Sequence, residues 1–132
     1  MLKEFSVSSR KKIELIDITA KVERIVKESG LKEGVVVVFI PHATAGLVLN
    51  EHESGLINDF EKWFEKSFRG DWEHDRIDDN ASAHLASGLI GSSVHLILSE
   101  GRILRGVWQN LFLVELDGPR KERKVLVKLI RS

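Results

Sequence analysis

Two histidines, His74 and His84, lie ten positions apart in a segment rich in acidic and amide side chains. The residues between them include Asp75, Asp78, Asp79 and Asn80. Neutral imidazoles and carboxylates are common ligands of divalent metals, and the start of a helix favours phosphate. We therefore interpret this segment as part of a site for a metal ion, a phosphate group or both. The alternative is a surface loop histidine followed by a packed helix histidine.

Polar residues elsewhere in the chain could complete such a site. His42 follows an apolar run and Pro41, and Thr44 comes shortly after it. Glu51 is nine residues beyond His42 and has the chemistry of a general base or a further ligand. These residues also have an interpretation without a functional role. His42 could simply lie where a strand passes into a loop, and Glu51 could be a solvated side chain just before a helix.

Two polar residues interrupt an apolar face of a predicted strand. With a period of two, Gln109 and Glu115 point to the same side as Leu111 and Leu113. Burying a polar group without a partner costs about 1–3 kcal/mol. Each of the two side chains therefore either has a hydrogen-bonding partner or lines a cavity. The alternative is that this face lies at a sheet edge that is exposed to solvent. Arg120 follows the turn at Asp117 and carries a guanidinium group suited to phosphate or carboxylate.

These residues define the candidate site. We expect His42, His74 and His84 to hold a divalent metal ion such as zinc, magnesium or manganese. We expect Glu51, Asp75 and Gln109 to be catalytic, and Thr44, Asn80 and Arg120 to contact the phosphate of a substrate. His95 alternates with apolar neighbours and is interpreted as a structural or surface histidine.

Composition limits the class of protein. The 132 residues predict one domain over 1–132, and 42% hydrophobic with 30% charged residues is typical of a globular chain. Twenty basic and twenty acidic residues balance, which disfavours nucleic acid as a partner. There is no cysteine, no signal-like segment and no apolar stretch of membrane-spanning length. We expect a cytoplasmic protein without membrane contact.

The pattern of apolar residues predicts an α+β fold with a mostly antiparallel, sandwich-like or barrel-like sheet and two or three helices. Predicted helices begin near Asp17 or Thr19 and end at Gly30, begin at Ser54, and run from Ala81 to about Leu89. Predicted strands lie around residues 3–8, 13–15, 35–40, 47–49, 94–98, 103–116 and 125–130. The run 35–40 is expected to be covered on both faces, and the strand 103–116 to bend at Gly106.

An ordered set of motifs resembles the YjbQ (UPF0047) family, a group also described as secondary thiamine-phosphate synthase enzymes. The motifs are His42–Gly46, Asn50–Glu51, His74–Asp75, Asp79–Asn80 with Ala83–His84, Ser92–Ser93, Gly101, Gly106–Gln109 and Asp117–Arg120. The resemblance covers nearly the whole chain. Val107 stands where the family usually has threonine, and Arg76 and Ile77 replace the usual polar or glycine residues after His74.

The resemblance implies a YjbQ-like domain assembled as a homotrimer with a histidine-bound metal. It also implies weak formation of thiamine phosphate from a pyrimidine diphosphate and a thiazole phosphate. The residues leave two other functions open: a metal-dependent hydrolase of a small phosphorylated molecule, and a trimer that binds a metabolite without catalysis. They also leave open whether the protein is an enzyme.

Overall fold

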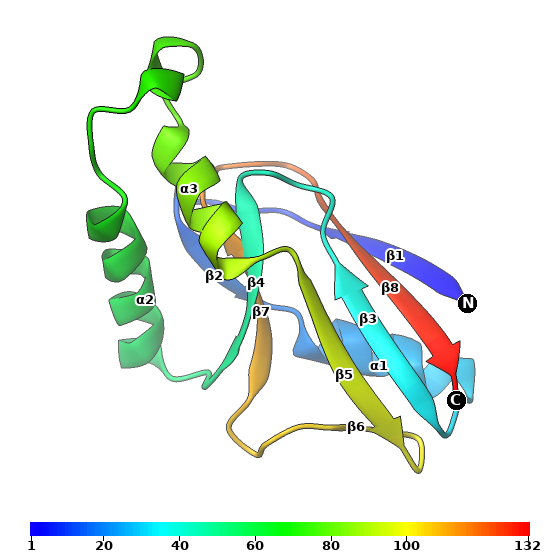
Figure 1. Cartoon of the computed structure of the whole chain (residues 1–132). Helices are drawn as coiled ribbons and strands as arrows, with labels where there is room; N and C mark the ends of the chain where they lie inside the picture. Colours follow the sequence, from blue (N-terminus) through cyan, green and yellow to red (C-terminus); the bar gives the residue numbers. More distant parts are fainter.

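The structure, a computed structural model, describes residues 1–132 and contains eight strands, three α-helices and one 3₁₀ turn (Figure 1). The strands are β1 (Leu2–Val7), β2 (Glu14–Asp17), β3 (Gly34–Phe39), β4 (Ala45–Asn50), β5 (Ser93–Ser99), β6 (Arg102–Leu104), β7 (Asn110–Glu115) and β8 (Arg123–Arg131). The helices are α1 (Thr19–Ser29), α2 (Ser54–Ser67) and α3 (Ala81–Ile90), and the 3₁₀ turn η1 spans Glu73–Arg76.

The strands form two antiparallel sheets. The larger sheet has the order β1-β8-β3-β5-β6, and the smaller sheet has the order β2-β7-β4. One hydrophobic cluster joins the larger sheet, α1 and one face of β7, which contributes Leu111 and Leu113. A second cluster joins the other face of β7, with Phe112 and Val114, to residues of α2 and α3. The α+β class with two packed antiparallel sheets and three helices is therefore confirmed.

Local sequence signals explain where the helices begin and end. Gly30 ends α1 in the left-handed conformation, with φ of 73°, which a residue without a Cβ adopts at no steric cost. The Glu53 carboxylate accepts hydrogen bonds from the backbone N–H groups of Gly55 (2.6 Å) and Leu56 (2.9 Å) at the start of α2. These bonds also lower the pKa of Glu53. The predicted C-terminal glycine of α1 is therefore confirmed, whereas neither Ile18 at the N-cap of α1 nor Asn80 at the N-cap of α3 makes a side-chain capping bond.

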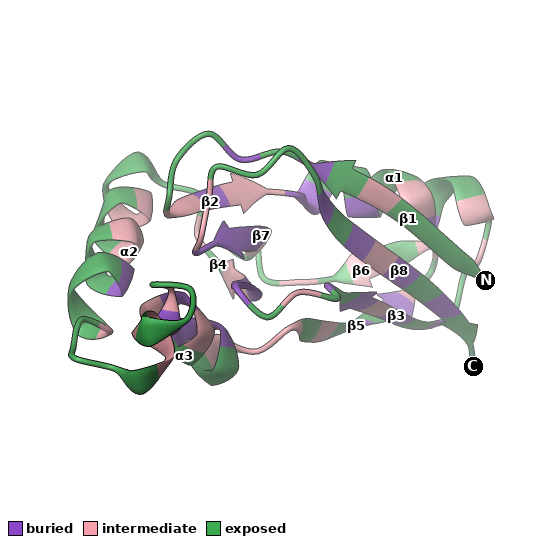
Figure 2. Ribbon diagram, turned by 90° about the horizontal axis from the view of Figure 1, so that it is seen from above, coloured by how far each residue is buried: buried purple, intermediate pink, exposed green.

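Two expectations about strands are wrong. The predicted strand 103–116 is two strands in different sheets, because residues 105–109 form a turn between β6 and β7. The strand β3 is covered on one face only: Val36 and Val38 are buried, whereas Val35 and Phe39 are 37% and 39% exposed (Figure 2). A run of β-branched residues therefore does not distinguish a strand with one buried face from a strand with two.

Candidate functional site

The pairing of β4 with β7 divides the predicted site residues between two ends of the molecule. Ala45 lies opposite Glu115 at one end of this strand pair, and Asn50 lies opposite Asn110 at the other. Five strand steps separate the two ends by about 17 Å. Five of the predicted residues are linked by hydrogen bonds to the Glu115 end, namely His42, Thr44, His74, Asn80 and Arg120. Glu51 and Gln109 lie at the Asn110 end.

At the Glu115 end, His74 and His84 lie side by side. Their ring centroids are 4.6 Å apart and the rings meet edge to face at 76°. η1 carries His74 and α3 carries His84, and both side chains are half-buried. An open pocket of about 390 Å³ adjoins them, lined by Trp72, His74, Ala81, His84 and Leu85. The structure thus brings together the two histidines that are ten positions apart in the sequence.

A chain of hydrogen bonds determines which ring nitrogen of His74 carries the hydrogen when the imidazole is neutral. Asp117 Oδ2 accepts from Asn80 Nδ2 (2.9 Å) and from Arg120 Nη2 (3.0 Å). A carboxylate only accepts hydrogen bonds, so the amide of Asn80 presents its Oδ1 to His74. The His74 Nε2–H therefore donates to Asn80 Oδ1 (3.0 Å), and the neutral ring keeps its lone pair on Nδ1. Nδ1 of His74 is the atom available to bind a proton, a metal or a ligand.

Asp75 stabilises the start of α3. Its Oδ1 accepts a hydrogen bond from the backbone N–H of Ala81 (2.8 Å), while Asn80 at the N-cap position makes no such side-chain bond. A carboxylate therefore already neutralises part of the positive end of this helix. The helix start offers less to a phosphate than the sequence indicated, although Oδ2 of Asp75 makes no hydrogen bond within the chain.

His42 has a different environment. Its Nε2 accepts a hydrogen bond from the backbone N–H of Lys124 (2.8 Å), which requires a neutral nitrogen at that position. Burial lowers the pKa of His42, and the positive charge of Arg123 lowers it further. No group of three or more His, Asp or Glu residues is arranged to hold a metal within the chain. The three-histidine set therefore does not fit a metal centre built by one chain, and only His74 and His84 remain a candidate pair.

A buried ion pair between Glu115 and Arg123 supports this end of the molecule. Glu115 is 0% exposed and Arg123 is 2% exposed, and Arg123 Nε donates to Glu115 Oε1 at 2.9 Å. Arg123 Nη2 also donates to the Oγ1 and the backbone oxygen of Thr44, each at 3.0 Å. Thr44 is itself buried, so its hydroxyl is engaged in this network. A partner was one of the alternatives that the sequence left open for Glu115, but nothing in the sequence singled out Arg123.

The same network positions the loop that carries Arg120. The Ser9 hydroxyl donates to Glu115 Oε1 (2.7 Å) and accepts from the backbone N–H of Arg120 (2.8 Å). The backbone N–H of Asp117 donates to Glu115 Oε2 (3.0 Å). The buried Glu115 carboxylate therefore holds both ends of the turn from Asp117 to Arg120. The side chains of this turn also orient Asn80 and, through Asn80, His74.

The Asn110 end has its own polar cluster around Asp17. Asp17 Oδ2 receives hydrogen bonds from His52 Nδ1 (2.6 Å) and Asn110 Nδ2 (2.7 Å). Burial alone would raise the pKa of Asp17, but its hydrogen bonds outweigh this and lower the pKa to about 2. The sequence did not reveal this cluster, because Asp17 was considered only as the start of a helix and His52 is 35 positions away from it.

The two predicted catalytic residues at this end lie beside that cluster. The carboxylate of Glu51 makes no hydrogen bond within the chain, although the residue is partly buried. Gln109 is exposed and precedes β7; its Oε1 accepts from the backbone N–H of Gly106 (2.8 Å). Gln109 thus closes a turn instead of interrupting a strand face, because β7 begins one residue later.

Comparisons with known proteins agree with this architecture. The family described as UPF0047 protein YjbQ-like matches residues 3–132. A UPF0047 protein of Archaeoglobus fulgidus is 41% identical over 129 residues, covering 96% of this chain and 99% of that protein. YugU of Bacillus subtilis, another UPF0047 protein, is 36% identical and covers 91% and 92% of the two chains.

Solved structures show the same fold. A YbjQ-like protein of unknown function from Sulfolobus solfataricus has a TM-score of 0.98 and 42% identity, covering 100% of this chain and 97% of that one. A hypothetical protein of Aeropyrum pernix has a TM-score of 0.97 and 34% identity, covering 100% and 99%.

The two-sheet α+β domain is thus shared by a class of small proteins whose function is not established. Within that class, the chain belongs to the YjbQ-like UPF0047 family, as the sequence motifs predicted. No helix in the structure combines the length and the apolar character that crossing a membrane requires.

Proposed function

We propose that the pocket beside His74 and His84 binds a phosphorylated small molecule. The observation that carries the proposal is the contact between the two imidazoles, one of which has its free lone pair fixed on Nδ1 by Asn80 and Asp117. Arg120 adds a permanent positive charge, and its Nη1 group makes no hydrogen bond within the chain. The Arg120 guanidinium donates to the oxygens of a phosphate or diphosphate, and the lone pair on His74 Nδ1 accepts from a protonated phosphate oxygen or binds a metal.

The family resemblance supports a transferase reaction at this pocket, the joining of a pyrimidine diphosphate to a thiazole phosphate. The bond between the pyrimidine methylene carbon and the diphosphate breaks, and the thiazole nitrogen forms a bond to that carbon. Pyrophosphate leaves with the electron pair. Arg120 would stabilise its developing charge, His84 would contact the leaving group, and Asn80 would keep His74 in a fixed orientation. The products are thiamine phosphate and pyrophosphate.

A divalent ion, if bound, would neutralise pyrophosphate charge, with His74 and His84 as the two ligands from this chain. The roles given above to Arg120 and Asn80 do not depend on it. The family resemblance also supports a homotrimer in the cytoplasm. Native mass measurement with metal analysis, before and after chelation, tests the trimer and the ion together. A metal-free monomer would contradict both proposals.

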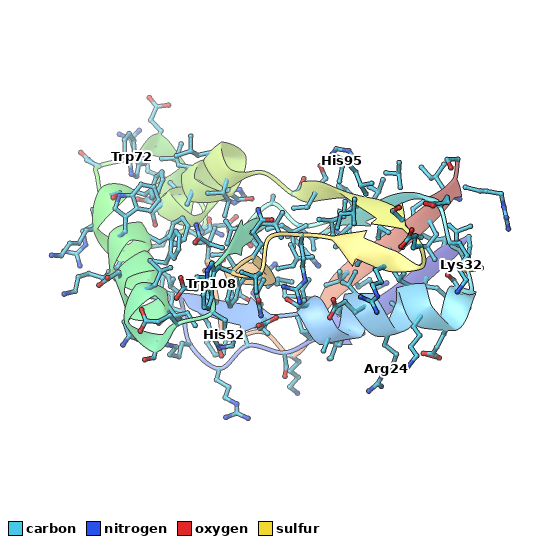
Figure 3. All side chains as sticks on the ribbon, turned by 90° about the horizontal axis from the view of Figure 1, so that it is seen from below. Arg24, Lys32, His52, Trp72, His95 and Trp108 are labelled. Atoms are coloured by element: carbon cyan, nitrogen blue, oxygen red, sulfur yellow. The ribbon has the colours of Figure 1, made fainter.

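The decisive experiment compares two histidine variants in a thiamine-phosphate synthesis assay and in rescue of a thiamine auxotroph. His84→Ala should lose most of the activity. His95→Ala is the matched control because His95 is an exposed histidine on β5, in the larger sheet, and lines none of the pocket (Figure 3). Activity that survives His84→Ala unchanged would reject this site.

A hydrolase of a small phosphorylated molecule is the second candidate. The free Nδ1 of His74 and the free Oδ2 of Asp75 are two possible bases for activating a water molecule at the same end of the chain. Glu51 is an unsuitable base for this pocket within one chain because it lies at the far end of β4. A phosphatase and phosphodiesterase panel, with added metal and with chelator, separates hydrolysis from synthesis.

Binding without catalysis is the third possibility. It predicts thermal stabilisation by phosphorylated metabolites that His84→Ala abolishes, together with inactivity in both the synthesis assay and the hydrolase panel. Turnover in either assay would exclude it.

A further inference from the structure

A second groove, larger than the paired-histidine pocket, lies between α1 and the β5–β6 hairpin. Its volume is about 780 Å³, within the range of small-molecule sites. Figure 3 shows α1 and β6 side by side on this face, with Lys32 at one end. The lining residues are Glu23, Val26, Lys27, Lys32, Glu100, Gly101, Arg102, Ile103, Arg105, Gly106 and Val107.

Contacts at both ends hold the two walls of this groove together. At one end the backbone N–H of Gly101 donates to the backbone oxygen of Lys32 (3.0 Å), which fastens the hairpin to the segment after α1. At the other end Arg105 Nη2 approaches Glu23 Oε2 of α1 (3.5 Å), and Arg105 Nη1 donates to the backbone oxygen of Gln109 (2.5 Å). The groove is therefore formed before any ligand arrives.

The charges of the groove favour an anion. Four lining residues are cationic and two are acidic, and one of the acids, Glu23, is already paired with Arg105. Lys27, Lys32 and Arg102 make no ion pair within the chain, in contrast to one unpaired carboxylate, that of Glu100. Lys27 lies in the last turn of α1, where the negative end of the helix balances part of its charge. Lys32 and Arg102 are therefore the expected anion contacts.

Three apolar residues line the groove beside its charged residues. Val26 is buried in the main core, Ile103 is partly buried, and Val107 is 79% exposed. We propose that this groove binds a nucleoside diphosphate, with the phosphates on Lys32 and Arg102 and the ring system against Ile103 and Val107. The site is separate from the paired-histidine pocket, since no residue lines both.

Calorimetric titration of the full chain with ADP in metal-free buffer tests this site. We expect ADP to bind with one site per chain, and inorganic pyrophosphate and adenosine to bind more weakly than ADP because each lacks one half of the contacts. The double substitution Lys32→Ala and Arg102→Ala should weaken ADP binding by roughly tenfold or more, as expected for lost charge-assisted hydrogen bonds.

Two further variants test whether the loss of ADP binding is specific to this groove. Arg24→Ala removes an exposed cation from the side of α1 away from β6, and it should change the affinity less than twofold (Figure 3). The loss of ADP affinity caused by Lys32→Ala with Arg102→Ala should be the same in the presence and absence of His84→Ala, which separates this groove from the proposed active site. The proposal is overturned if ADP does not bind the unmodified protein at millimolar concentration, if Lys32→Ala with Arg102→Ala has no effect, or if Arg24→Ala weakens binding equally.

Discussion

Replacing Arg123 by methionine is expected to remove about 3–5 kcal/mol from the free energy of unfolding at pH 7. The guanidinium group makes two hydrogen bonds to the Glu115 carboxylate and two to Thr44, in a region where Glu115 is 0% exposed. Methionine fills a similar volume but provides no donor, so the carboxylate stays buried with only Ser9 and the Asp117 backbone N–H as partners. That loss is a large share of the roughly 5–15 kcal/mol that stabilises a typical domain.

The size of this loss should depend on pH in a defined direction. Burial by itself would raise the pKa of Glu115, but the hydrogen bonds led by that of Arg123 outweigh it and hold the pKa below its usual 4.5. Without Arg123 the burial effect dominates, and the carboxyl group takes up a proton at a higher pH than in the unfolded chain. The stability difference between the two proteins should therefore shrink as the pH falls from 7 towards 4.

Denaturant unfolding followed by tryptophan fluorescence, at fixed protein concentration, measures these quantities. Lys124→Met is the matched control because Lys124 is the exposed neighbour of Arg123 on β8; it should change stability by no more than about 0.5 kcal/mol. Combining Arg123→Met with Glu115→Leu should recover much of the loss, because no charge then remains buried. A loss below about 1 kcal/mol, or one that does not change with pH, would refute the reasoning.

Three further predictions concern other positions. Asp17→Asn should lower the free energy of unfolding by about 1 kcal/mol at neutral pH, a value reduced because Asp17 is partly exposed. The difference from the unmodified protein should vanish as the pH falls from about 4 to about 2, through the lowered pKa of Asp17. Urea unfolding at neutral pH and across this acid range measures it. Gly34→Ala should destabilise the fold by roughly 2 kcal/mol or more because its Cβ would lie 2.1 Å from the backbone oxygen of Ile130. Gly88→Ala should instead stabilise the fold by about 0.5–1 kcal/mol, because a Cβ in this helix has no neighbour within 4 Å. Equal effects of the two substitutions in thermal unfolding would contradict both predictions. The lowered pKa of His42 means that its contribution to stability is complete above about pH 6.5 and declines below it, so His42→Gln should show a weaker loss of stability between pH 7 and 5.

Local sequence patterns were sufficient for most of the secondary structure. The periodic apolar residues and Gly30 located α1, and the strands around Phe5, Leu15 and Val36 lie close to the predicted positions. The segment 103–116 was predicted wrongly because an exposed turn and a strand have similar residue preferences when the turn contains Val107 and Trp108. Only the partner strands decide where β6 ends and β7 begins.

The candidate site divides in the same way. His74, Asn80 and His84 are near one another in sequence, so a short turn and one helix start are enough to bring them together. Glu51 and His42 are nine residues apart, but the extended strand β4 between them carries Glu51 to the opposite end of the sheet. Proximity along the chain therefore predicted the histidine pair correctly and does not place Glu51 beside it.

By itself, the sequence determined the α+β class, the family and the paired-histidine segment, since these depend on local periodicity, capping and short-range spacing. The tertiary structure alone decided that Arg123 neutralises Glu115 and that Asp117 orients Asn80. Such contacts follow from strand register and sheet packing, in which a shift of one residue turns every side chain to the other face.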